Sequence, residues 1–333
     1  MPPVVAGARS GARAPLRIIV RNPAECKPKN RGACARMAIL EASSTKCGDS
    51  PGPSARRGIV NAGFVQDRIN QAVWRSRGAL RGYGRASGWT DPGEAAAIAW
   101  IAERVRDEPI LDVGVGGGRT VPLLKTISAD YTAVDYTPEL VEICRRNHPG
   151  TRVHRMDARD MSAFADESFS LVVFSYNGID AVDHDGRMAI LKEFARVLRP
   201  GGFTLFSTHN LAGPSYREGP SRLARLPRRS ANPFAIALDA ARIAYSLPVG
   251  AFNYFRNSRF NRVFDGYAMR VCAAHKFGIL VMYTDFATQQ RQLADVGLKL
   301  RAAFGGSSGE PVRRDQDLGG EAWLHFVASK PCG

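Results

Sequence analysis

The glycine-rich stretch PILDVGVGGGRT, at residues 109–120, constrains the fold more than any other part of this chain. A short apolar run is followed at once by a turn that contains several glycines. Glycine-rich turns of this kind let the backbone come close to a nucleotide-like ligand at the end of a strand. A dinucleotide pattern GxGxxG that began at Gly114 would need a third glycine where Arg119 stands. The stretch therefore predicts a cofactor-binding loop of another kind.

From residue 109 onward, short apolar runs alternate with segments of helical periodicity. This alternation is typical of an α/β protein with a mostly parallel sheet covered by helices on both faces. Ligands bind at the carboxyl ends of the strands in such a sheet, so we expect the chemistry there. The expected strands occupy residues 109–114, 130–135, 151–157, 170–175 and 202–208. Their carboxyl ends carry Asp112 with the glycines, Asp135, Asp157, residues 175–178 and residues 208–210.

Two helices are expected before the first strand. The second begins with Asp91 as a capping residue, Pro92 in the first turn and Glu94 three residues after the cap. This is the arrangement of a capping box, so we interpret Glu94 as a capping residue rather than a catalytic one. The first helix, within residues 64–80, places on one face Val65, Ile69, Ala72, Val73 and Leu80.

The composition fits a soluble globular protein. The chain of 333 residues is 44% hydrophobic and 23% charged, which is enough to bury a full core. No segment reaches the roughly 18 uncharged apolar residues that a membrane span requires, since the most apolar one contains Asp239 and Arg242. The six cysteines show neither a CxxC pair nor the spacing of metal ligands. We therefore expect reduced thiols in a cytoplasmic protein without a metal site.

The first 55 residues differ from the rest of the chain. They hold nine Lys or Arg against three Asp or Glu, a net charge of +6, and prolines interrupt any apolar period. This composition predicts a disordered basic tail at residues 1–55, ahead of a domain at residues 56–333. Two alternatives are an organellar transit peptide, suggested by arginines at every fourth position from Arg9 to Arg21, and translation that begins at Met37.

The glycine loop and the acid that closes the next strand strongly resemble the motifs of class I S-adenosylmethionine-dependent methyltransferases. The residues that carry this resemblance are Asp112, Gly114, Gly116, Gly118 and Asp135. Two further segments fit that family: a helical stretch at residues 187–202 that ends in two glycines, and a helix stopped at Gly297 before two strands. The resemblance covers residues 89–330. It implies a Rossmann-like, mostly parallel sheet of seven strands with an antiparallel C-terminal hairpin.

The resemblance also implies S-adenosyl-L-methionine as the cofactor. The glycines would face its methionine end, Asp135 would accept hydrogen bonds from both ribose hydroxyls, and Asp157 would face the adenine amino group. The role of Asp135 is chemically reasonable, because a carboxylate offers two acceptor oxygens to a vicinal diol. The expected cofactor-binding residues are Asp112, Gly114, Gly116, Gly118, Asp135, Asp157, Ala158 and Ser175.

Residues 175–178, Ser-Tyr-Asn-Gly, follow the fourth expected strand. Family members that methylate exocyclic amino groups of nucleic acids usually carry Pro-Pro there. Cytosine-C5 enzymes need a Pro-Cys nucleophile, and Pro-Cys occurs here only at residues 331–332. We therefore do not expect nucleic-acid bases as substrates. Tyr176 and Asn177 are expected to shape the acceptor pocket instead.

His209, at the end of the fifth expected strand, is the candidate catalytic base. An imidazole can take up a proton near neutral pH, which a hydroxyl acceptor would require. The alternative is a hydrogen-bonded loop histidine. The acid-rich residues 180–185 could suggest a magnesium site, but a solvated loop that caps the following helix is the simpler interpretation.

An insert of 66 residues, 211–276, follows the fifth expected strand and carries 11 Lys or Arg against three Asp or Glu, a net charge of +8. We expect a helical lid here. Aromatic residues alternate with Arg256, Arg259 and Arg262, a pattern that can bind sugars, bases, phosphates or carboxylates. A helical lid whose basic side faces the solvent explains the pattern equally well. An anionic acceptor beneath a positive lid is the hypothesis that follows from the first interpretation.

These observations predict an enzyme that transfers a methyl group from S-adenosyl-L-methionine to a small-molecule or glycan-like acceptor by O-methylation. A nucleophile from the protein is not required, because in-line displacement depends mainly on holding the reactants close and aligned. The alternative is a cofactor-binding protein without catalysis that engages RNA through its basic segments.

Overall fold

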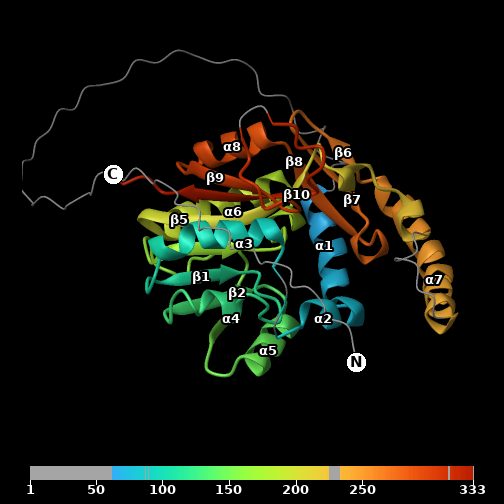
Figure 1. The fold of residues 1–333 in the computed structure, drawn as a ribbon, viewed down its shortest axis with the longest axis horizontal. Coiled ribbons are helices and arrows are strands. Elements are labelled where there is room, and N and C mark those ends of the chain that lie inside the picture. Colours follow the sequence, from blue (N-terminus) through green and yellow to red (C-terminus); the bar gives the residue numbers. More distant parts are fainter. Residues whose placement is uncertain (1–61, 87, 89, 225–232, 314–315, 333) are drawn as a thin grey trace, which may run out of the picture. The chain divides into compact units, whose positions relative to one another are not determined.

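The structure, a computed structural model, describes residues 62–86, 88, 90–224, 233–313 and 316–332 (Figure 1). The chain divides into two units, residues 1–55 and 56–333, and the first lies wholly outside the described residues. The predicted basic tail and its two alternatives therefore stay predictions. Everything that follows concerns the second unit.

One sheet carries the predicted strands. Seven of its strands are β1 (Ile110–Val113), β2 (Tyr131–Asp135), β3 (Arg152–Arg155), β4 (Phe169–Phe174), β5 (Leu198–Asn210), β9 (Lys299–Gly305) and β10 (Trp323–Ser329). The first five are parallel in the order β3-β2-β1-β4-β5, and the antiparallel pair β10 and β9 continues the sheet from β5. The mostly parallel sheet with its antiparallel C-terminal hairpin is thus confirmed (Figure 1).

Three further strands extend the sheet from the end of β5. They are β6 (Arg262–Val263), β7 (Tyr267–Cys272) and β8 (Ile279–Thr284). The attachment is short, because only His209 and Asn210 of β5 pair with β8. The prediction of a helical insert at residues 211–276 is therefore only partly correct. β8 is buried along its whole length, and such a strand lacks the polar–apolar alternation that would reveal it in a sequence.

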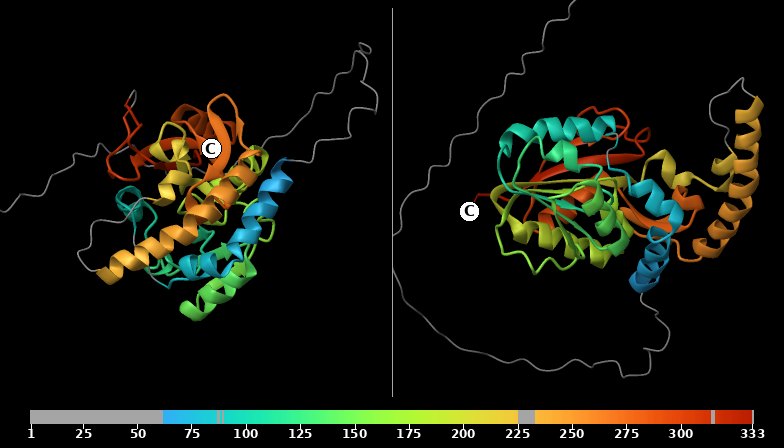
Figure 2. Two further views of the ribbon diagram at one scale, coloured as in Figure 1. Left: turned by 90° about the vertical axis from the view of Figure 1, so that its right-hand side faces the viewer. Right: turned by 90° about the horizontal axis from the view of Figure 1, so that it is seen from below.

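The insert and the residues just after it also hold helical segments. These are η3 (Pro214–Arg217), η4 (Pro220–Ala224), α7 (Pro233–Ser258) and η5 (Ala274–Lys276). α7 contacts η4, η5 and β7, and it lies at the outer end of the sheet, away from β1–β4 (Figures 1 and 2). Among the helices that the structure describes, none is long and apolar enough to cross a bilayer.

Helices cover both faces of the sheet, as predicted (Figure 1). One face carries α3 (Pro92–Ile101), η1 (Ala102–Arg104), α4 (Val121–Leu124) and α5 (Pro138–Asn147), and the other carries α6 (His184–Val197) and α8 (Phe286–Asp295). Successive residues of a strand point to opposite faces of the sheet. Ile110 therefore packs in the core beneath α3, α4 and α5, and Leu111 packs in the core beneath α6 and α8. These layers hold the carboxyl ends of the parallel strands at one edge of the sheet.

α1 (Ala62–Trp74) packs on β8, and α2 (Arg77–Tyr83) follows it. The most buried side chains of α1 are Gln66 and Asn70, whereas Ala72 of the predicted apolar stripe is exposed. Asn70 Nδ2 donates to the carbonyl oxygen of Leu280 at 2.8 Å, and Asn70 Oδ1 accepts from the Leu280 N–H at 3.0 Å. These bonds satisfy the polar groups that burial removes from water. The predicted apolar stripe is therefore only partly correct, because Ile69 and Val73 do pack against apolar clusters but the two most buried positions are polar.

Candidate active site

The glycine loop between β1 and α4 is held in a conformation that only glycine adopts easily. Gly114, Gly116 and Gly118 have φ angles of 65°, 57° and 97°. A Cβ at Gly114 would lie 2.4 Å from the Phe174 ring, and one at Gly118 would lie 2.3 Å from the His148 ring. The loop therefore needs glycine at both positions for space as well as for backbone conformation.

Asp135, the last residue of β2, joins this loop to the neighbouring strand. Its Oδ2 accepts a hydrogen bond from the Gly116 N–H at 2.9 Å, and its Oδ1 accepts one from the Thr137 N–H at 2.8 Å. Burial raises the pKa of Asp135, and the two N–H donors partly oppose that rise. Each carboxylate oxygen has a second lone pair, so Asp135 can still accept hydrogen bonds from a ligand diol.

Asp112 lies beneath the loop and is 1% exposed. Its Oδ2 accepts hydrogen bonds from the hydroxyls of Thr120 at 2.5 Å and Tyr131 at 2.6 Å. Burial raises the pKa of Asp112 to about 6, although both hydroxyls act in the opposite direction. In the structure Asp112 braces the loop from below, with its acceptor oxygen already occupied by two side chains.

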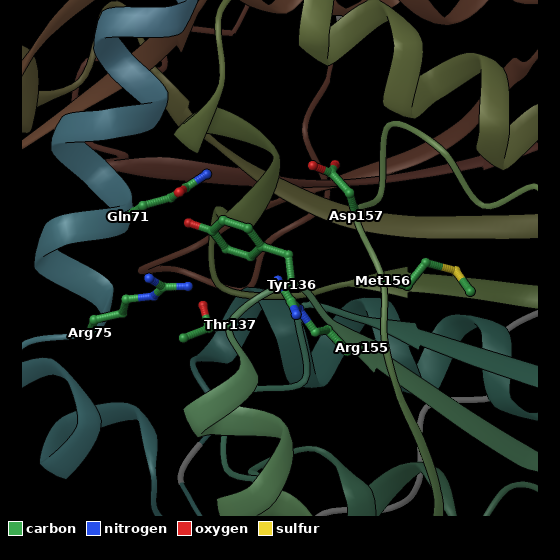
Figure 3. Close-up of a pocket in the computed structure, with 7 residues that line it drawn as sticks. All are labelled: Gln71, Arg75, Tyr136, Thr137, Arg155, Met156 and Asp157. Carbon is green, nitrogen blue, oxygen red and sulfur yellow. The ribbon is translucent and has the colours of Figure 1, made fainter.

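Three cavities adjoin one another along the strand ends. The first, of about 430 Å³, is lined by Tyr136 and Asp157 together with Gln71 of α1 and Arg75, which follows that helix (Figure 3). The central cavity, of about 700 Å³, shares Tyr136 and Thr137 with the first, and shares the glycine loop with a third of about 340 Å³. Because neighbouring cavities share these residues, the three form one continuous groove along the strand ends.

Asp157 reaches the first cavity, as expected, but its carboxylate is already engaged. Arg159 donates to Asp157 Oδ1 through Nε at 3.0 Å and to Oδ2 through Nη2 at 2.7 Å, and it also pairs with Asp67. Burial raises the pKa of Asp157, but the bonds from Arg159 outweigh it and lower the pKa overall. The neighbouring Ala158 is half-buried. No motif in the sequence indicated this arginine.

Arg119, which lines the third cavity, forms an ion pair that the sequence did not predict. Arg119 donates to both carboxylate oxygens of Glu94, at 2.7 and 2.8 Å, and to the Ser175 hydroxyl at 2.6 Å. Asp91 does cap α3 by accepting from the Glu94 N–H at 2.8 Å, so that part of the prediction is confirmed. The Glu94 side chain, however, turns to Arg119 and Ser175 because they offer buried charge-assisted bonds. The full capping box was the wrong interpretation.

Tyr176 and Asn177 both line the central cavity in a left-handed backbone conformation, with φ angles of 58° and 59°. Non-glycine residues adopt this conformation at a cost of about 1 kcal/mol or more, and they concentrate at functional sites. The Asn177 N–H donates to the Ser207 hydroxyl at 2.7 Å. Asn177 Oδ1 is buried and has no hydrogen-bond partner among the described residues.

His209 lines the same cavity and is bound by a fully buried aspartate. Asp180 Oδ2 lies 2.7 Å from His209 Nδ1 and also accepts from the His209 backbone N–H at 2.7 Å. Asp180 further binds the Thr208 hydroxyl at 2.7 Å and forms an ion pair with the buried Arg187. The acid-rich segment is thus not solvated at Asp180, whereas Asp183 does cap α6 as predicted.

Cys272, the last residue of β7, lines the same cavity as His209, and the two side chains interact electrostatically. Burial lowers the pKa of His209, but the interactions with Asp180 and Cys272 outweigh it and raise the pKa to about 10. Burial raises the pKa of Cys272, and the interaction with His209 lowers it overall. The imidazole therefore does not titrate near neutral pH, contrary to the sequence-based expectation, because the sequence did not show its buried partners.

Residues 211–224 cover the central cavity. Ser215, Glu218, Arg222 and Leu223 line it, and Arg222 Nε donates to Glu218 at 2.7 Å. By contrast, Arg256, Arg259 and Arg262 line none of the three cavities and are exposed. The interpretation of these arginines as a positive lid above the substrate is therefore wrong, because Arg256 lies on the exposed side of α7, Arg259 follows that helix, and Arg262 lies in β6.

Comparison with known proteins also indicates a methyltransferase domain. Residues 110–202 match the family model of a methyltransferase domain. A demethylmenaquinone methyltransferase of Chlorobaculum parvum is 36% identical over 30% of this chain and 40% of its own length. A ubiquinone biosynthesis O-methyltransferase of Xanthomonas campestris is 30% identical over 47% of this chain and 60% of its own. The chain thus spans less than two thirds of either relative.

A solved 1,6-didemethyltoxoflavin-N1-methyltransferase of Burkholderia thailandensis, with bound 1,6-didemethyltoxoflavin and S-adenosylhomocysteine, is 14% identical, with a TM-score of 0.47 over 85% of this chain and 93% of that chain. The family match contains the glycine loop, Asp135, Asp157 and Ser175, which are the residues that build the groove. This chain therefore carries a methyltransferase domain of the class I, S-adenosylmethionine-dependent family.

Proposed function

We propose that this protein transfers the methyl group of S-adenosyl-L-methionine to a hydroxyl group on a small molecule with an apolar body. One observation carries the proposal: Asp135 and the glycine loop line the same cavity as His209, whose ring is bound by Asp180. The residues that would bind the methyl donor and the histidine that would accept a proton thus line one cavity. Methyl transfer to a hydroxyl requires both. The proposal assigns the transfer to residues 56–333 and a cytoplasmic location to the protein.

The cofactor would lie along the groove, with its adenine beside Tyr136, Asp157 and Ala158, its ribose hydroxyls at Asp135 and its amino-acid end at the glycine loop. Gly114 and Gly116 line the central cavity together with Asp135, which supports this fit, because a residue without a side chain leaves its backbone accessible to a ligand. Asp112 would brace the loop and Ser175 would hold Arg119 beside it. When bound, the cofactor supplies a methyl group activated by the sulfonium.

The acceptor would occupy the rest of the central cavity. Apolar and aromatic side chains there favour an apolar or aromatic body over a glycan. A relative named for O-methylation in ubiquinone biosynthesis also supports a hydroxyl on a small molecule. The side chains that would contact the acceptor body include Trp74, Tyr83, Phe174, Ile279, Val281 and Trp323.

His209 would receive or hold the proton of the acceptor hydroxyl. Its pKa of about 10 matches that of a phenol, about 10, so sharing the proton between the two costs little. The acceptor oxygen would form a bond to the methyl carbon as the carbon–sulfur bond breaks, and the hydroxyl proton would go to His209 once the imidazole has lost its own proton to solvent. Tyr176 and Asn177 would orient the acceptor, since Asn177 Oδ1 has no partner among the described residues.

The test is a panel of apolar phenols and matched apolar amines incubated with the protein and S-adenosyl-L-methionine that carries a labelled methyl group. The expected product is a labelled phenyl methyl ether, identified by mass spectrometry. Asp135→Ala should abolish labelling and weaken cofactor binding in calorimetry, because the diol acceptor is gone. Labelling of the amines alone, or of no compound, would contradict the proposal.

A further inference from the structure

The exposed large apolar side chains concentrate in one part of the molecule. Eight such residues are exposed among those that the structure describes, and one of them, Tyr176, belongs to the active site. The other seven fall within residues 236–264. They are Ile236, Leu238, Tyr245, Phe252, Phe255, Val263 and Phe264. Scattered exposed apolar residues need no explanation, but a contiguous group of them marks an interaction surface.

α7 turns its apolar side outward. Six exposed residues follow one another at alternating spacings of three and four, which places them in a row along one side of the helix. They are Leu238, Ala241, Tyr245, Pro248, Phe252 and Phe255. We call this row the α7 outer row. Phe252 and Phe255 are 64% and 72% exposed.

The opposite side of α7 attaches to the rest of the unit through small and polar residues and through Tyr254, whose ring lies 5.3 Å from that of Phe277. Asn253 Nδ2 donates to the Lys276 carbonyl oxygen and Asn257 Nδ2 to the Phe277 carbonyl oxygen, each at 3.1 Å. Gly250 lets Leu223 of η4 approach, since a Cβ there would lie 2.0 Å from it. A surface helix normally buries its apolar side, whereas α7 leaves five large apolar side chains exposed.

Positive charge accompanies the outer row. Arg242, Arg256 and Arg259 are exposed on or just after α7, and the Arg256 guanidinium lies 5.5 Å from the centre of the Phe252 ring. The one acidic residue of α7, Asp239, lies 3.7 Å from Arg242 and is paired with it. The outer side of α7 is therefore apolar and cationic, with no exposed acid of its own.

We propose that the α7 outer row docks on an anionic phospholipid surface, with the helix lying parallel to the membrane plane. The apolar side chains would enter the boundary between headgroups and acyl chains, and the arginines would contact lipid phosphates. A second copy of this chain fits less well, because two such rows would bring like charges together. RNA would account for the arginines but would leave the aliphatic and phenyl groups of the row exposed.

Docking would also bring the active site to the lipid. Leu223 contacts α7 at Gly250 and lines the central cavity, so the cavity wall lies directly behind the docked helix. An acceptor with an apolar body could then enter from the membrane. This last step depends on the proposed function, whereas the docking itself does not.

The experiment is flotation of the full chain with vesicles of phosphatidylcholine alone and of phosphatidylcholine mixed with phosphatidylglycerol. We expect binding to the mixed vesicles that weakens as salt is added. Phe252→Gln with Phe255→Gln, and separately Arg256→Glu with Arg259→Glu, should each reduce the affinity at least tenfold. Lys125→Glu with Arg146→Glu is the matched charge control, because both residues are exposed on other elements, and it should bind like the parent.

Circular dichroism and thermal melting must show that each variant is folded like the parent. The proposal is overturned if the parent binds neither kind of vesicle, or if both outer-row variants bind as the parent does. It is also overturned if the phenylalanine variant loses self-association instead of vesicle binding. Binding to RNA that only the arginine variant loses, without vesicle binding by the parent, would assign the surface to nucleic acid. None of these readouts requires methyl transfer.

Discussion

Asp180 determines the protonation of His209 from a position without solvent contact. It is 0% exposed, and it accepts from the backbone N–H and binds Nδ1 of His209 while paired with Arg187. A buried carboxylate this close favours the charged imidazolium. The sequence pattern predicted that His209 would act as a base near neutral pH. It did not indicate that Asp180 would bind this imidazole.

The first prediction concerns the pH dependence of methyl transfer. The pKa of His209 is raised to about 10, so the imidazolium dominates at neutral pH and the neutral imidazole grows as pH rises through that value. If neutral His209 accepts the proton, kcat should rise with pH between 7 and 10. Initial rates at saturating acceptor across this range test it. A rate that is flat from pH 7 upward would contradict it.

The second prediction concerns the thiol. The interaction with His209 lowers the pKa of Cys272 against the effect of burial, whereas burial raises the pKa of Cys144 to about 12. Because the thiolate is the reactive form, iodoacetamide at pH 7 should label Cys272 well before Cys144, as read by peptide mass spectrometry. His209→Ala should slow labelling of Cys272 and leave Cys144 unchanged. Equal labelling of both cysteines in the parent would count against the pair.

Helices and strands can be predicted from the sequence where apolar periodicity and turn residues mark them. Five strands of the methyltransferase sheet follow from apolar runs between glycines, and the family resemblance implied the C-terminal hairpin. The helical stretch predicted at residues 187–202 is α6, which ends at Val197 where β5 begins, and the helix predicted to stop at Gly297 is α8. β6–β8 were not predicted, because β8 is an unbroken buried run and the aromatic–arginine pattern before it also suits a helix. In the site, the strand-end acids and glycines were predictable from position. Arg119, Asp180 and Cys272 were not, because tertiary packing alone brings their partners to them.

The third prediction tests how α1 is attached to β8. Asn70 exchanges two hydrogen bonds with the backbone of Leu280 and donates a third to the Ala181 carbonyl at 2.8 Å, all in a buried place. Asn70→Ala leaves those backbone groups unsatisfied and should lower the free energy of unfolding by about 1–3 kcal/mol. Urea unfolding measures it. Gln290→Ala, at an exposed position of α8, is the control and should change stability by less than about 0.5 kcal/mol. A loss for Asn70→Ala no larger than that of the control would contradict the attachment.

In the whole molecule, most of the excess positive charge lies outside the residues that build the catalytic sheet. Residues 56–210 hold 20 Lys or Arg against 19 Asp or Glu, a net charge of +1, whereas residues 211–276 carry +8. The exposed arginines near α7 line none of the three cavities, and Arg222, which does line the central cavity, is paired with Glu218. The cofactor chemistry and the basic surface are therefore separate properties of one chain.

The fourth prediction concerns residues 1–55. They form a separate unit from residues 56–333, and their sequence has no apolar period that could join a core. Deleting them should leave the melting temperature of the second unit and its affinity for S-adenosylhomocysteine unchanged. Differential scanning calorimetry and titration calorimetry measure the two quantities. A melting temperature several degrees lower would mean that the segment contributes to the fold.

The most direct test of the central claim is steady-state kinetics of His209→Ala with a phenol that the parent methylates. His209 contacts Asp180 and Cys272 on the acceptor side of the cavity, and none of the contacts described here joins it to the glycine loop or Asp135. The account therefore predicts that kcat falls by on the order of 10², while the KM for S-adenosyl-L-methionine stays within about twofold of the parent value. An unchanged kcat from pH 6 to pH 9 would contradict the account and leave His209 as a structural residue.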